Sequence, residues 1–596
     1  MSRAARRSRY RKAFAHAAGA ALAVPLAVAG PAHAASSSAG SEYTVTALKF
    51  TVRAGDRSCT VDADLYRPVG VDAHHTAPAV LATNGFGGSK SDGSTDVIGK
   101  AFASRGYVGL VYSGLGFGRS GCLITLDDPA IDGRAATGLI DFLAGIRAAD
   151  DGTEADFVTR DGKGDPRVGM IGGSYGGAIQ MATAAVDRRV DALVPLITWN
   201  DLSYALAPNN TATSTGVSSD TPGVFKWQWT NGFYLMGEGQ PVLNPALDPS
   251  RFGNLTCLHF ATRACDTIRL LNSGRYPAGK ADAMLDYARS VSPVSYLDKV
   301  EAPTLLVQGQ TDSLFNLNEA TATYRTLKAQ GVTAKMIWQS WGHSGGQVAG
   351  ELDLSQGNLE TSYVGQRVLA WFDHYLRQHK NTDTGPEFAY YRDWRSGYGT
   401  AATVPALSRK LYLSGDGGLV DTRAEVIRGS RRYANGPVAT SHSESSLAGI
   451  IGLPDPKPYD TEGTYLGWTS APLDSAVDVV GAPKATLKVV SPRTERVQNS
   501  GDAADKLVLF AKVYDVAPDG SKTLVNRLVS PVRVPDVTRP FTVQLPGIVH
   551  RYEAGHRLRF VIAGSDSAYL GNRGIKPVTV VSSPEDTGVL QLPVVG

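Results

Sequence analysis

A serine enclosed by glycines is the clearest candidate for chemistry in this chain. It lies in Gly172-Gly173-Ser174-Tyr175-Gly176-Gly177, after the apolar run 168–171 and before a helical pattern over 178–186. Glycines on both sides allow a sharp turn, so the serine hydroxyl projects above the sheet edge and the following helix points its N–H groups at the site. Strand, turn and helix together predict a nucleophile at Ser174. The alternative is a glycine-rich turn that contains an incidental serine.

A serine hydroxyl needs a base to remove its proton and an acid to hold that base in the right tautomer. We predict Asp312, which follows the apolar strand 303–308, as the acid and His343, in the glycine-rich loop 341–346, as the base. Loops at the carboxyl ends of parallel strands meet at one edge of a sheet, which would bring the three residues together. The alternatives are a turn-forming aspartate and a histidine in a surface loop.

Acyl transfer also requires hydrogen-bond donors for the developing oxyanion. The backbone N–H of the residue after the nucleophile, Tyr175, is expected to be one donor. The second should come from the loop Asn84-Gly85-Phe86-Gly87-Gly88. Because a phenylalanine has no hydroxyl, we expect a backbone N–H of Phe86 or Gly87 in this role. A glycine turn with a packing aromatic residue is the alternative.

The rest of the chain must position these residues. Its 596 residues, 42% of them hydrophobic, are more than one compact core normally organises. Short apolar runs alternate with helical patterns in the first part, which predicts a parallel sheet covered by helices on both faces. The segment 200–295 breaks this alternation and is expected to be an inserted cap. We therefore expect a catalytic α/β domain over 42–405 and, where helical periodicity is lost, an all-β sandwich or jelly roll over 406–596.

The N-terminus has the pattern of a secretory signal peptide. Arginines and a lysine precede an apolar stretch over 17–29, and Ala32-His33-Ala34 is a small-residue cleavage pattern. We expect residues 1–34 to be removed and the protein to be secreted, by either the general or the twin-arginine route. The net charge of +3 is spread along the chain, so we expect neither a nucleic acid nor a membrane partner.

Four cysteines remain after this leader. An even number in an exported protein is usually paired, and four cysteines allow three pairings. We prefer the pair Cys257 with Cys265, which closes a short loop, and Cys59 with Cys122 as the second bridge. Buried thiols are the alternative.

Several further stretches resemble the X-Pro dipeptidyl-peptidase family and its relatives, the cocaine esterases and cephalosporin acylases. Besides the serine motif, they are 65–68, 292–296, 302–309, 469–473 and 555–558. The resemblance implies an α/β-hydrolase core with a helical cap, a C-terminal jelly-roll domain and a covalent acyl-enzyme. It also implies that no metal or cofactor is needed.

Three departures from the family pattern limit what carries over. The family often has a tyrosine where this chain has Phe86, so one oxyanion contact is missing or replaced. The run Asp-x-Arg-Gly-x-Gly-x-Ser appears here as 113–120 without its Asp and Arg, which removes an ion pair. Relatives that hydrolyse amino-acid esters have acidic residues just after the triad acid to hold the substrate ammonium. Here Ser313-Leu314-Phe315 follows Asp312, which argues against that subgroup.

We predict a secreted serine hydrolase that acts as an X-Pro dipeptidyl-peptidase, which is the function that the resemblance favours, and two alternatives are compatible with the same residues. A dipeptidyl-peptidase would use cap aromatics, such as Trp199, Trp227 and Trp229, for a proline pocket, unless these form only the core of the cap. It would also need a carboxylate for the free amine, and Asp201 and Glu238 are the candidates. An ester or amide hydrolase would share every catalytic residue. The third reading is a catalytically inert, secreted binding protein whose sandwich contacts a polymer.

Overall fold

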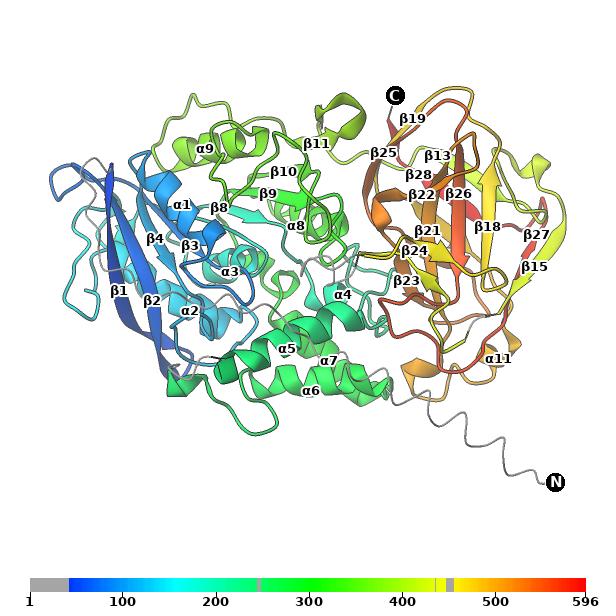
Figure 1. Ribbon diagram of the computed structural model, residues 1–596, viewed down its shortest axis with the longest axis horizontal. Helices are drawn as coiled ribbons and strands as arrows, with labels where there is room; N and C mark the ends of the chain where they lie inside the picture. Colours follow the sequence, from blue (N-terminus) through cyan, green and yellow to red (C-terminus); the bar gives the residue numbers. More distant parts are fainter. Residues whose placement is uncertain (1–41, 244–247, 435, 446–454, 596) are drawn as a thin grey trace.

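The computed structural model describes residues 42–243, 248–434, 436–445 and 455–595, except for the side chains of 241–243. The expected signal peptide, 1–34, lies outside the described residues. Figure 1 shows two parts side by side: a mixed α/β part on the left and a β-rich C-terminal part on the right.

A ten-stranded sheet runs through the first part. All pairs from β4 to β11 are parallel, and the strand pairs at both edges are antiparallel. In sheet order the strands are β1 (Tyr43–Ala54), β2 (Arg57–Pro68), β4 (Val108–Tyr112), β3 (Ala79–Thr83), β7 (Val168–Gly173), β8 (Val190–Leu196), β9 (Thr304–Gly309), β10 (Ala334–Gln339), β11 (Phe388–Arg392) and β12 (Gly397–Ala401). The central strands are continuous apolar runs because both faces of the sheet are covered.

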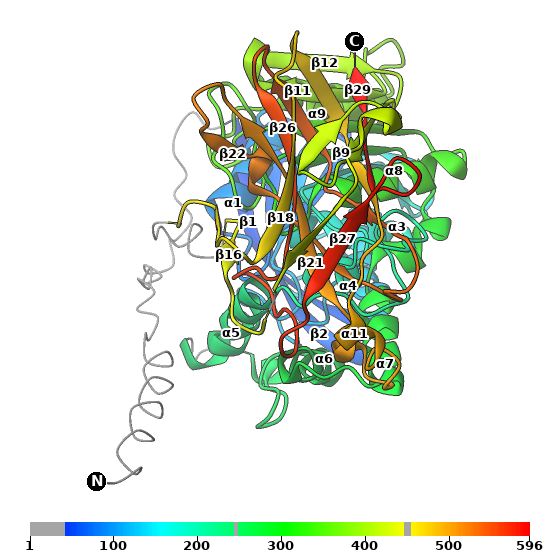
Figure 2. The ribbon, with the colours of Figure 1, turned by 90° about the vertical axis from the view of Figure 1, so that its right-hand side faces the viewer.

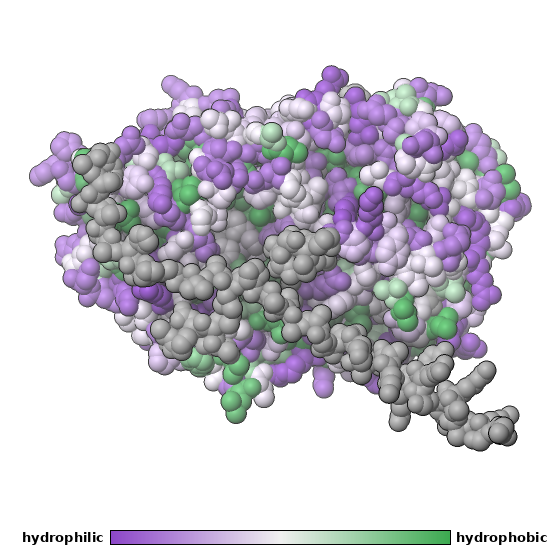
Figure 3. Space-filling model, in the orientation of Figure 1, coloured by the Kyte–Doolittle hydropathy of each residue, from purple (hydrophilic) through white to green (hydrophobic). Residues whose placement is uncertain are grey.

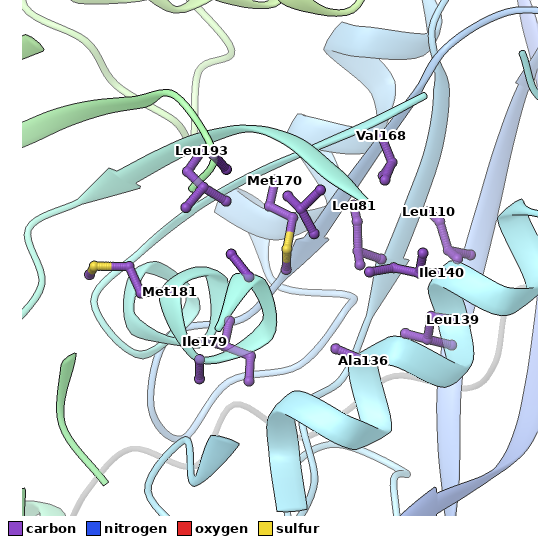
Figure 4. Close-up of a cluster of buried hydrophobic side chains, with 14 of the residues drawn as sticks. Leu81, Leu110, Ala136, Leu139, Ile140, Val168, Met170, Ile179, Met181 and Leu193 are labelled. Carbon is purple, nitrogen blue, oxygen red and sulfur yellow. The ribbon is translucent and has the colours of Figure 1, made fainter. Parts of the chain in front are cut away.

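Helices cover both faces. The side chains of α1 (Gly93–Ala103) and α9 (Tyr363–Tyr375) pack in one core. Those of α2 (Arg134–Leu143), α3 (Tyr175–Ala184) and α8 (Leu317–Ala329) pack in the other. Figure 4 shows side chains of α2 and α3 meeting those of the sheet, among them Leu81. Truncating such a fully buried leucine to alanine costs roughly 2–5 kcal/mol. This arrangement confirms the expected α/β-hydrolase core.

The segment between β8 and β9 forms a helical cap. Its helices are α4 (Leu202–Leu206), α5 (Trp227–Leu243), α6 (Thr262–Ser273) and α7 (Ala278–Ser290). Figure 1 shows α5, α6 and α7 along the lower edge of the molecule. The Asn, Thr, Ser and Pro clusters that interrupt the pattern of the core in this part of the sequence lie in the connections between these helices.

The C-terminal part is built almost entirely of strands around its own core, as expected. The largest sheet has the order β22-β21-β26-β18-β14-β13-β28-β20-β24, and β23 also pairs with β21. The strands are β13 (Arg409–Leu413), β14 (Gly418–Val420), β15 (Gly429–Tyr433), β16 (Ser441–His442), β17 (Tyr459–Asp460), β18 (Tyr465–Ser470), β19 (Val477–Gly481), β20 (Lys484–Leu487), β21 (Val508–Val516), β22 (Lys522–Leu524), β23 (Ser530–Arg533), β24 (Phe541–Gln544), β25 (Ile548–Tyr552), β26 (Arg557–Ala563), β27 (Val578–Ser582), β28 (Val589–Leu592) and β29 (Val594–Val595).

Shorter elements connect these units. They are β5 (Arg160–Gly162), β6 (Asp165–Pro166), α11 (Pro492–Glu495), η1 (Pro129–Gly133), η2 (Pro249–Arg251), η3 (Pro293–Ser295), η4 (Leu297–Lys299), η5 (Asp393–Arg395), η6 (Arg423–Glu425), η7 (Ala503–Asp505) and η8 (Val525–Arg527).

The C-terminal part packs against the cap through buried polar contacts. The guanidinium of Arg533, which is 1% exposed, donates to the carbonyl oxygens of Pro222 (2.9 Å) and Gly223 (3.0 Å). In the view from the C-terminal side, strands β18, β21 and β27 lie in front and the cap helices α5, α6 and α7 lie in the lower part (Figure 2). Removing the arginine would leave buried carbonyls unpaired, so this contact ties the two parts firmly.

Two disulfides join Cys59 to Cys122 and Cys257 to Cys265. The first ties β2 to the loop after β4, and the second lies within the cap. None of the described helices is long and apolar enough to span a bilayer. On the face shown in Figure 3, exposed apolar residues are scattered among hydrophilic ones.

Candidate active site

Ser174 lies at a strained turn between β7 and α3. Its φ of 57° and ψ of −118° place it outside the regions that ordinary residues prefer. The glycines around Ser174 are needed because a side chain at their positions would clash with neighbouring backbone atoms. A Cβ on Gly176 would lie 2.5 Å from the Thr83 carbonyl oxygen, and one on Gly172 would lie 2.6 Å from the Gly176 carbonyl oxygen. The glycine pattern therefore lets helix α3 start directly beside β3 with the serine at its tip.

The structure brings Ser174, His343 and Asp312 together. The Oγ of Ser174 lies 2.9 Å from Nε2 of His343, and Nδ1 of His343 lies 2.7 Å from Oδ2 of Asp312. The three residues follow β7, β10 and β9, so all lie at the carboxyl edge of the parallel sheet. A neutral imidazole with its proton on Nδ1 can donate to the carboxylate and accept the serine proton at Nε2.

The carboxylate of Asp312 is fully buried and accepts hydrogen bonds on both oxygens. Oδ1 accepts from the N–H groups of Leu314 (2.9 Å) and Phe315 (2.7 Å). Oδ2 accepts from the N–H of His343 (3.2 Å) as well as from its ring. These donors satisfy the buried carboxylate oxygens in place of water. The rings of Phe315 and Trp229 stand edge-on to the imidazole and restrict its movement.

The expected oxyanion donors come from the start of α3 and from the loop after β3. Tyr175 is the first residue of α3, and the first N–H groups of a helix have no partner within it. Gly87, in the loop after β3, has a φ of 84°, which only glycine adopts easily. The ring of Phe86 packs edge-on against Phe117 and Tyr175. This residue therefore contributes an apolar wall, and any hydrogen bond from it must come from its backbone.

A pocket opens at Ser174 between the core and the cap. The space between its lining residues is about 860 Å³, a figure that includes the open mouth. All four cap helices contribute. Its lining is Phe86, Leu126, Ser174, Tyr175, Trp199, Leu202, Leu206, Thr230, Phe233, Tyr234, Phe260, Ala264, Thr267, Ile268, Leu271, Tyr287, Ala288, Leu314 and Phe315. None of these described residues carries a carboxylate or a positive charge.

Of the three tryptophans predicted to bind substrate, Trp199 lines this pocket. Trp229 is fully buried beneath it and donates from Nε1 to the hydroxyl of Ser313 (3.3 Å). Trp227 faces the C-terminal part, where its Nε1 donates to the Ser567 carbonyl oxygen (2.9 Å). Residues 227 and 229 are two apart in α5 and so lie on different faces of the helix, and neither is in the described lining of the pocket.

The two carboxylates considered for a substrate amine are already occupied. Asp201 is buried, accepts from the N–H of Ser203 and lies 3.5 Å from the guanidinium of Arg289. Glu238 accepts from the N–H groups of Leu258 (2.8 Å) and His259 (3.0 Å). Both hold the cap together, and neither is among the described residues that line the pocket.

One described group has the spacing of metal ligands: Glu238 with Cys257 and Cys265. Its two sulfurs are bonded to each other and so cannot act as thiolate ligands. The group is therefore part of the cap scaffold.

The run 113–120, which lacks the Asp and Arg of the family pattern, is held by another cation. The buried guanidinium of Arg251, from the cap, donates to the carbonyl oxygens of Gly118 (2.7 Å) and Gly116. Burial lowers its pKa to about 10. An arginine distant in sequence thus anchors this loop, which no local pattern could indicate.

A polar link also joins the acid and base loops, and none of the sequence motifs predicts it. Ser313 and Ser344, the residues after Asp312 and His343, share a hydrogen bond between their hydroxyls. Ser313 also donates to the carbonyl oxygen of Ser445, from the C-terminal part (3.1 Å). Beneath them lies the ammonium of Lys226. The signal in the sequence is that Lys226 is the single charge in the aromatic stretch 223–229.

The chain is similar to known hydrolases. A family model described as X-Pro dipeptidyl-peptidase (S15 family) matches residues 56–345, and one described as the X-Pro dipeptidyl-peptidase C-terminal non-catalytic domain matches 332–577. Candidate serine esterases of Mycobacterium bovis and Mycobacterium tuberculosis are each 25% identical over 320 residues, 47% of this chain. The matched region spans about half, 48%, of the length of these curated relatives.

Solved structures share the fold over almost the whole chain. An α-amino acid ester hydrolase has a TM-score of 0.65 at 16% identity and covers 96% of this chain and 100% of its own. An aminopeptidase from a marine sediment archaeon, Thaumarchaeota archaeon, has a TM-score of 0.63 at 15% identity and covers 93% and 97%. A CocE/NonD family hydrolase from Staphylococcus aureus scores 0.61 at 13% identity, covering 93% and 94%. The two family models cover both parts of the chain in order, and the chain belongs to the X-Pro dipeptidyl-peptidase (S15) family.

Proposed function

We propose that this protein is a serine hydrolase that works through an acyl-enzyme on Ser174. The observation that carries the proposal is the 2.9 Å contact between Ser174 Oγ and His343 Nε2, in a site where Asp312 holds the other ring nitrogen. His343 takes the serine proton as Oγ attacks the carbonyl carbon of the substrate. The N–H groups of Tyr175 and of Phe86 or Gly87 bind the resulting oxyanion.

The same base completes the cycle. His343 returns the proton to the leaving alcohol or amine, and the acyl group stays on Ser174. Water then enters, gives a proton to His343 and attacks the ester, which releases the acid and restores the serine. Asp312 keeps the ring oriented and stabilises its protonated form in both halves.

The pocket favours esters or amides with a neutral, apolar acyl group. A free N-terminal ammonium would lose its hydration without gaining a carboxylate, because none of the described lining residues supplies one. Aromatic and aliphatic groups would instead gain about 25 cal/mol for each Å² removed from water. A dipeptidyl-peptidase remains the second candidate, because the family model that matches 56–345 carries that description.

A substrate panel distinguishes the two. Purified protein is assayed on p-nitrophenyl butyrate, on Ala-Pro and Gly-Pro anilides, and on the N-acetylated anilides. We expect turnover of the ester and little of the anilides. Faster cleavage of a free Ala-Pro anilide than of its acetylated form would instead establish the dipeptidyl-peptidase.

Catalysis by Ser174 is tested on the same panel. Ser174→Ala should lose about a thousandfold or more of the activity. Ser355→Ala, in an exposed turn, is the matched control and should keep it. Equal activity in Ser174→Ala and wild type would reject the proposal, and no turnover or labelling by wild type would favour an inert binding protein.

We further propose that the mature protein is exported after cleavage near Ala34 and has a catalytic domain over 42–405 and a C-terminal domain over 406–596. Two disulfides support an oxidising destination. The boundary is supported by the strands, since the first sheet ends with β12 and the second begins with β13. N-terminal sequencing of secreted protein tests the cleavage position.

A further inference from the structure

A buried lysine lies behind the loop that carries the acid. Lys226 precedes helix α5 of the cap and is 3% exposed. Its ammonium donates to the carbonyl oxygens of Ser313 (2.5 Å) and Leu314 (3.3 Å). A buried cation is costly unless it is well paired, so a lysine that binds two peptide carbonyls at this position requires an explanation.

The explanation lies in the two peptide groups themselves. The carbonyl of Ser313 belongs to the same peptide group as the N–H of Leu314, and the carbonyl of Leu314 to the same group as the N–H of Phe315. Both N–H groups donate to Oδ1 of Asp312. Each peptide group therefore bridges the ammonium and the carboxylate, with its carbonyl on the cation and its N–H on the anion.

This orientation of the two peptide groups stabilises both the ammonium and the carboxylate. The ammonium polarises each peptide group and strengthens the hydrogen bond from its N–H to the carboxylate. It also fixes the two peptide planes, and Asp312 keeps its own orientation only while those N–H groups face it. The effect is large because Lys226 and Asp312 are both buried, and charges in a protein interior are poorly screened.

Other charged and titratable groups face Lys226. Burial lowers its pKa, and Glu444, Asp312 and Glu319 act against that effect. Glu444, from the C-terminal part, accepts a hydrogen bond from the hydroxyl of Tyr569, whose ring lies 5.9 Å from the ammonium. Burial raises the pKa of Glu444 to about 7, and Lys226 opposes that rise. Cap, core and C-terminal part thus meet at this lysine.

We propose that Lys226 is a positioning residue of the active site, which orients the 313–315 peptide groups onto Asp312 and supplies the positive charge that stabilises the ionised acid. The proposal rests on the proposed function, because Asp312 must act as the acid of the triad. It also assigns a role to the cap beyond shaping the pocket: the cap completes the support of the catalytic residues.

The test is the pH dependence of covalent labelling of Ser174 by a fluorophosphonate, which needs no knowledge of the substrate. Lys226→Gln removes the charge and keeps an amide NH₂ group that can still donate hydrogen bonds. A unit charge removed on the order of 10 Å away, at an effective dielectric constant of about 20, shifts a protonation equilibrium by about one pH unit. Loss of a cation favours the protonated imidazole, which cannot accept the serine proton. The pH at which the labelling rate falls on acidification (the acidic limb of the rate profile) should therefore be higher by about one pH unit.

Two further variants separate positioning from stability. Lys226→Arg keeps the charge, so the acidic limb of its rate profile should lie close to the wild-type pH. Lys576→Gln is the matched control, because Lys576 is equally buried and also donates to backbone carbonyls, those of Asp505 (2.8 Å) and Lys506 (2.6 Å), in the C-terminal part. Lys576→Gln should lower the melting temperature without changing the pH of the acidic limb.

The proposal would be overturned if folded Lys226→Gln had its acidic limb at the wild-type pH. It would also be overturned if Lys576→Gln shifted the pH of that limb by the same amount as Lys226→Gln. If Lys226→Gln does not fold, Lys226→Met, of similar length and also neutral, is measured against the same expectation. Failure of the proposed function has a different signature, because wild-type Ser174 would then not be labelled at any pH.

Discussion

The geometry around Asp312 makes Asp312→Asn the most informative substitution. Both carboxylate oxygens accept only from N–H groups, two on Oδ1 and two on Oδ2. An asparagine oxygen can satisfy the two backbone donors at Oδ1 only if its NH₂ faces His343. The ring must then accept at Nδ1 and carry its proton on Nε2, where it donates to Ser174 and cannot take the serine proton.

The size of the effect follows from this change of tautomer. A triad with the wrong tautomer loses about 10⁴ in kcat, which corresponds to about 5.4 kcal/mol of transition-state stabilisation. The opposite amide orientation would place NH₂ against two backbone N–H groups, those of Leu314 and Phe315, instead of the single longer contact from the N–H of His343, and would lower the stability more. We therefore expect kcat/KM for p-nitrophenyl butyrate to fall by 10³ to 10⁴, roughly, with KM little changed.

The assay compares initial rates at pH 8 with melting curves of the same preparations. Asp416→Asn is the matched control, since Asp416 also accepts a backbone N–H, that of Gly418 (3.0 Å), but lies in the C-terminal part. It should be fully active. A loss of less than tenfold in folded Asp312→Asn would refute the assignment of Asp312 as the acid that orients His343.

Three further predictions follow from the pocket, the buried carboxyl groups and the disulfides. Ile268→Glu should lower kcat/KM for apolar esters at least about tenfold more than the neutral Ile268→Gln, because it buries a charge in the pocket; equal losses would contradict the apolar acyl site. Burial raises the pKa of Glu319 to about 8 from its ordinary 4.5, against hydrogen bonds from the N–H groups of Asn200 and Asp201. Between about pH 5 and 8 the folded protein thus keeps a proton that the unfolded chain releases, so the free energy of unfolding should fall as the pH rises through this range. In urea unfolding, Glu319→Gln should remove roughly 1–3 kcal/mol of that fall. An identical pH dependence of stability in wild type and Glu319→Gln would contradict this prediction. Replacing Cys59 and Cys122 together by serine should cost about 2–4 kcal/mol, measured by the same unfolding, and an unchanged stability would be the contrary result.

Local patterns predicted the parts of the site that depend on local geometry. The serine turn, the strand ends before Asp312 and His343, and the alternation of strands and helices each leave a signature within about ten residues. Chain order then sufficed to select one aspartate and one of 11 histidines. The structure places His343 within hydrogen-bond distance of both Ser174 and Asp312.

What the sequence could not predict depends on tertiary packing of the cap. Trp227 and Trp229 are two residues apart, yet one donates to the C-terminal part and the other lies beneath the active site. The roles of Lys226 and Arg251 are equally nonlocal, because each binds carbonyl oxygens of a loop far away in the chain. No periodicity or motif encodes such pairings.

The central claim is that Ser174 is a nucleophile activated by His343. Its most direct test is mass spectrometry of the protein after reaction with a fluorophosphonate. The account predicts one adduct, on the peptide that contains Ser174, absent in Ser174→Ala and formed much more slowly in His343→Gln. An adduct on another serine, or labelling of His343→Gln at the wild-type rate, would contradict it.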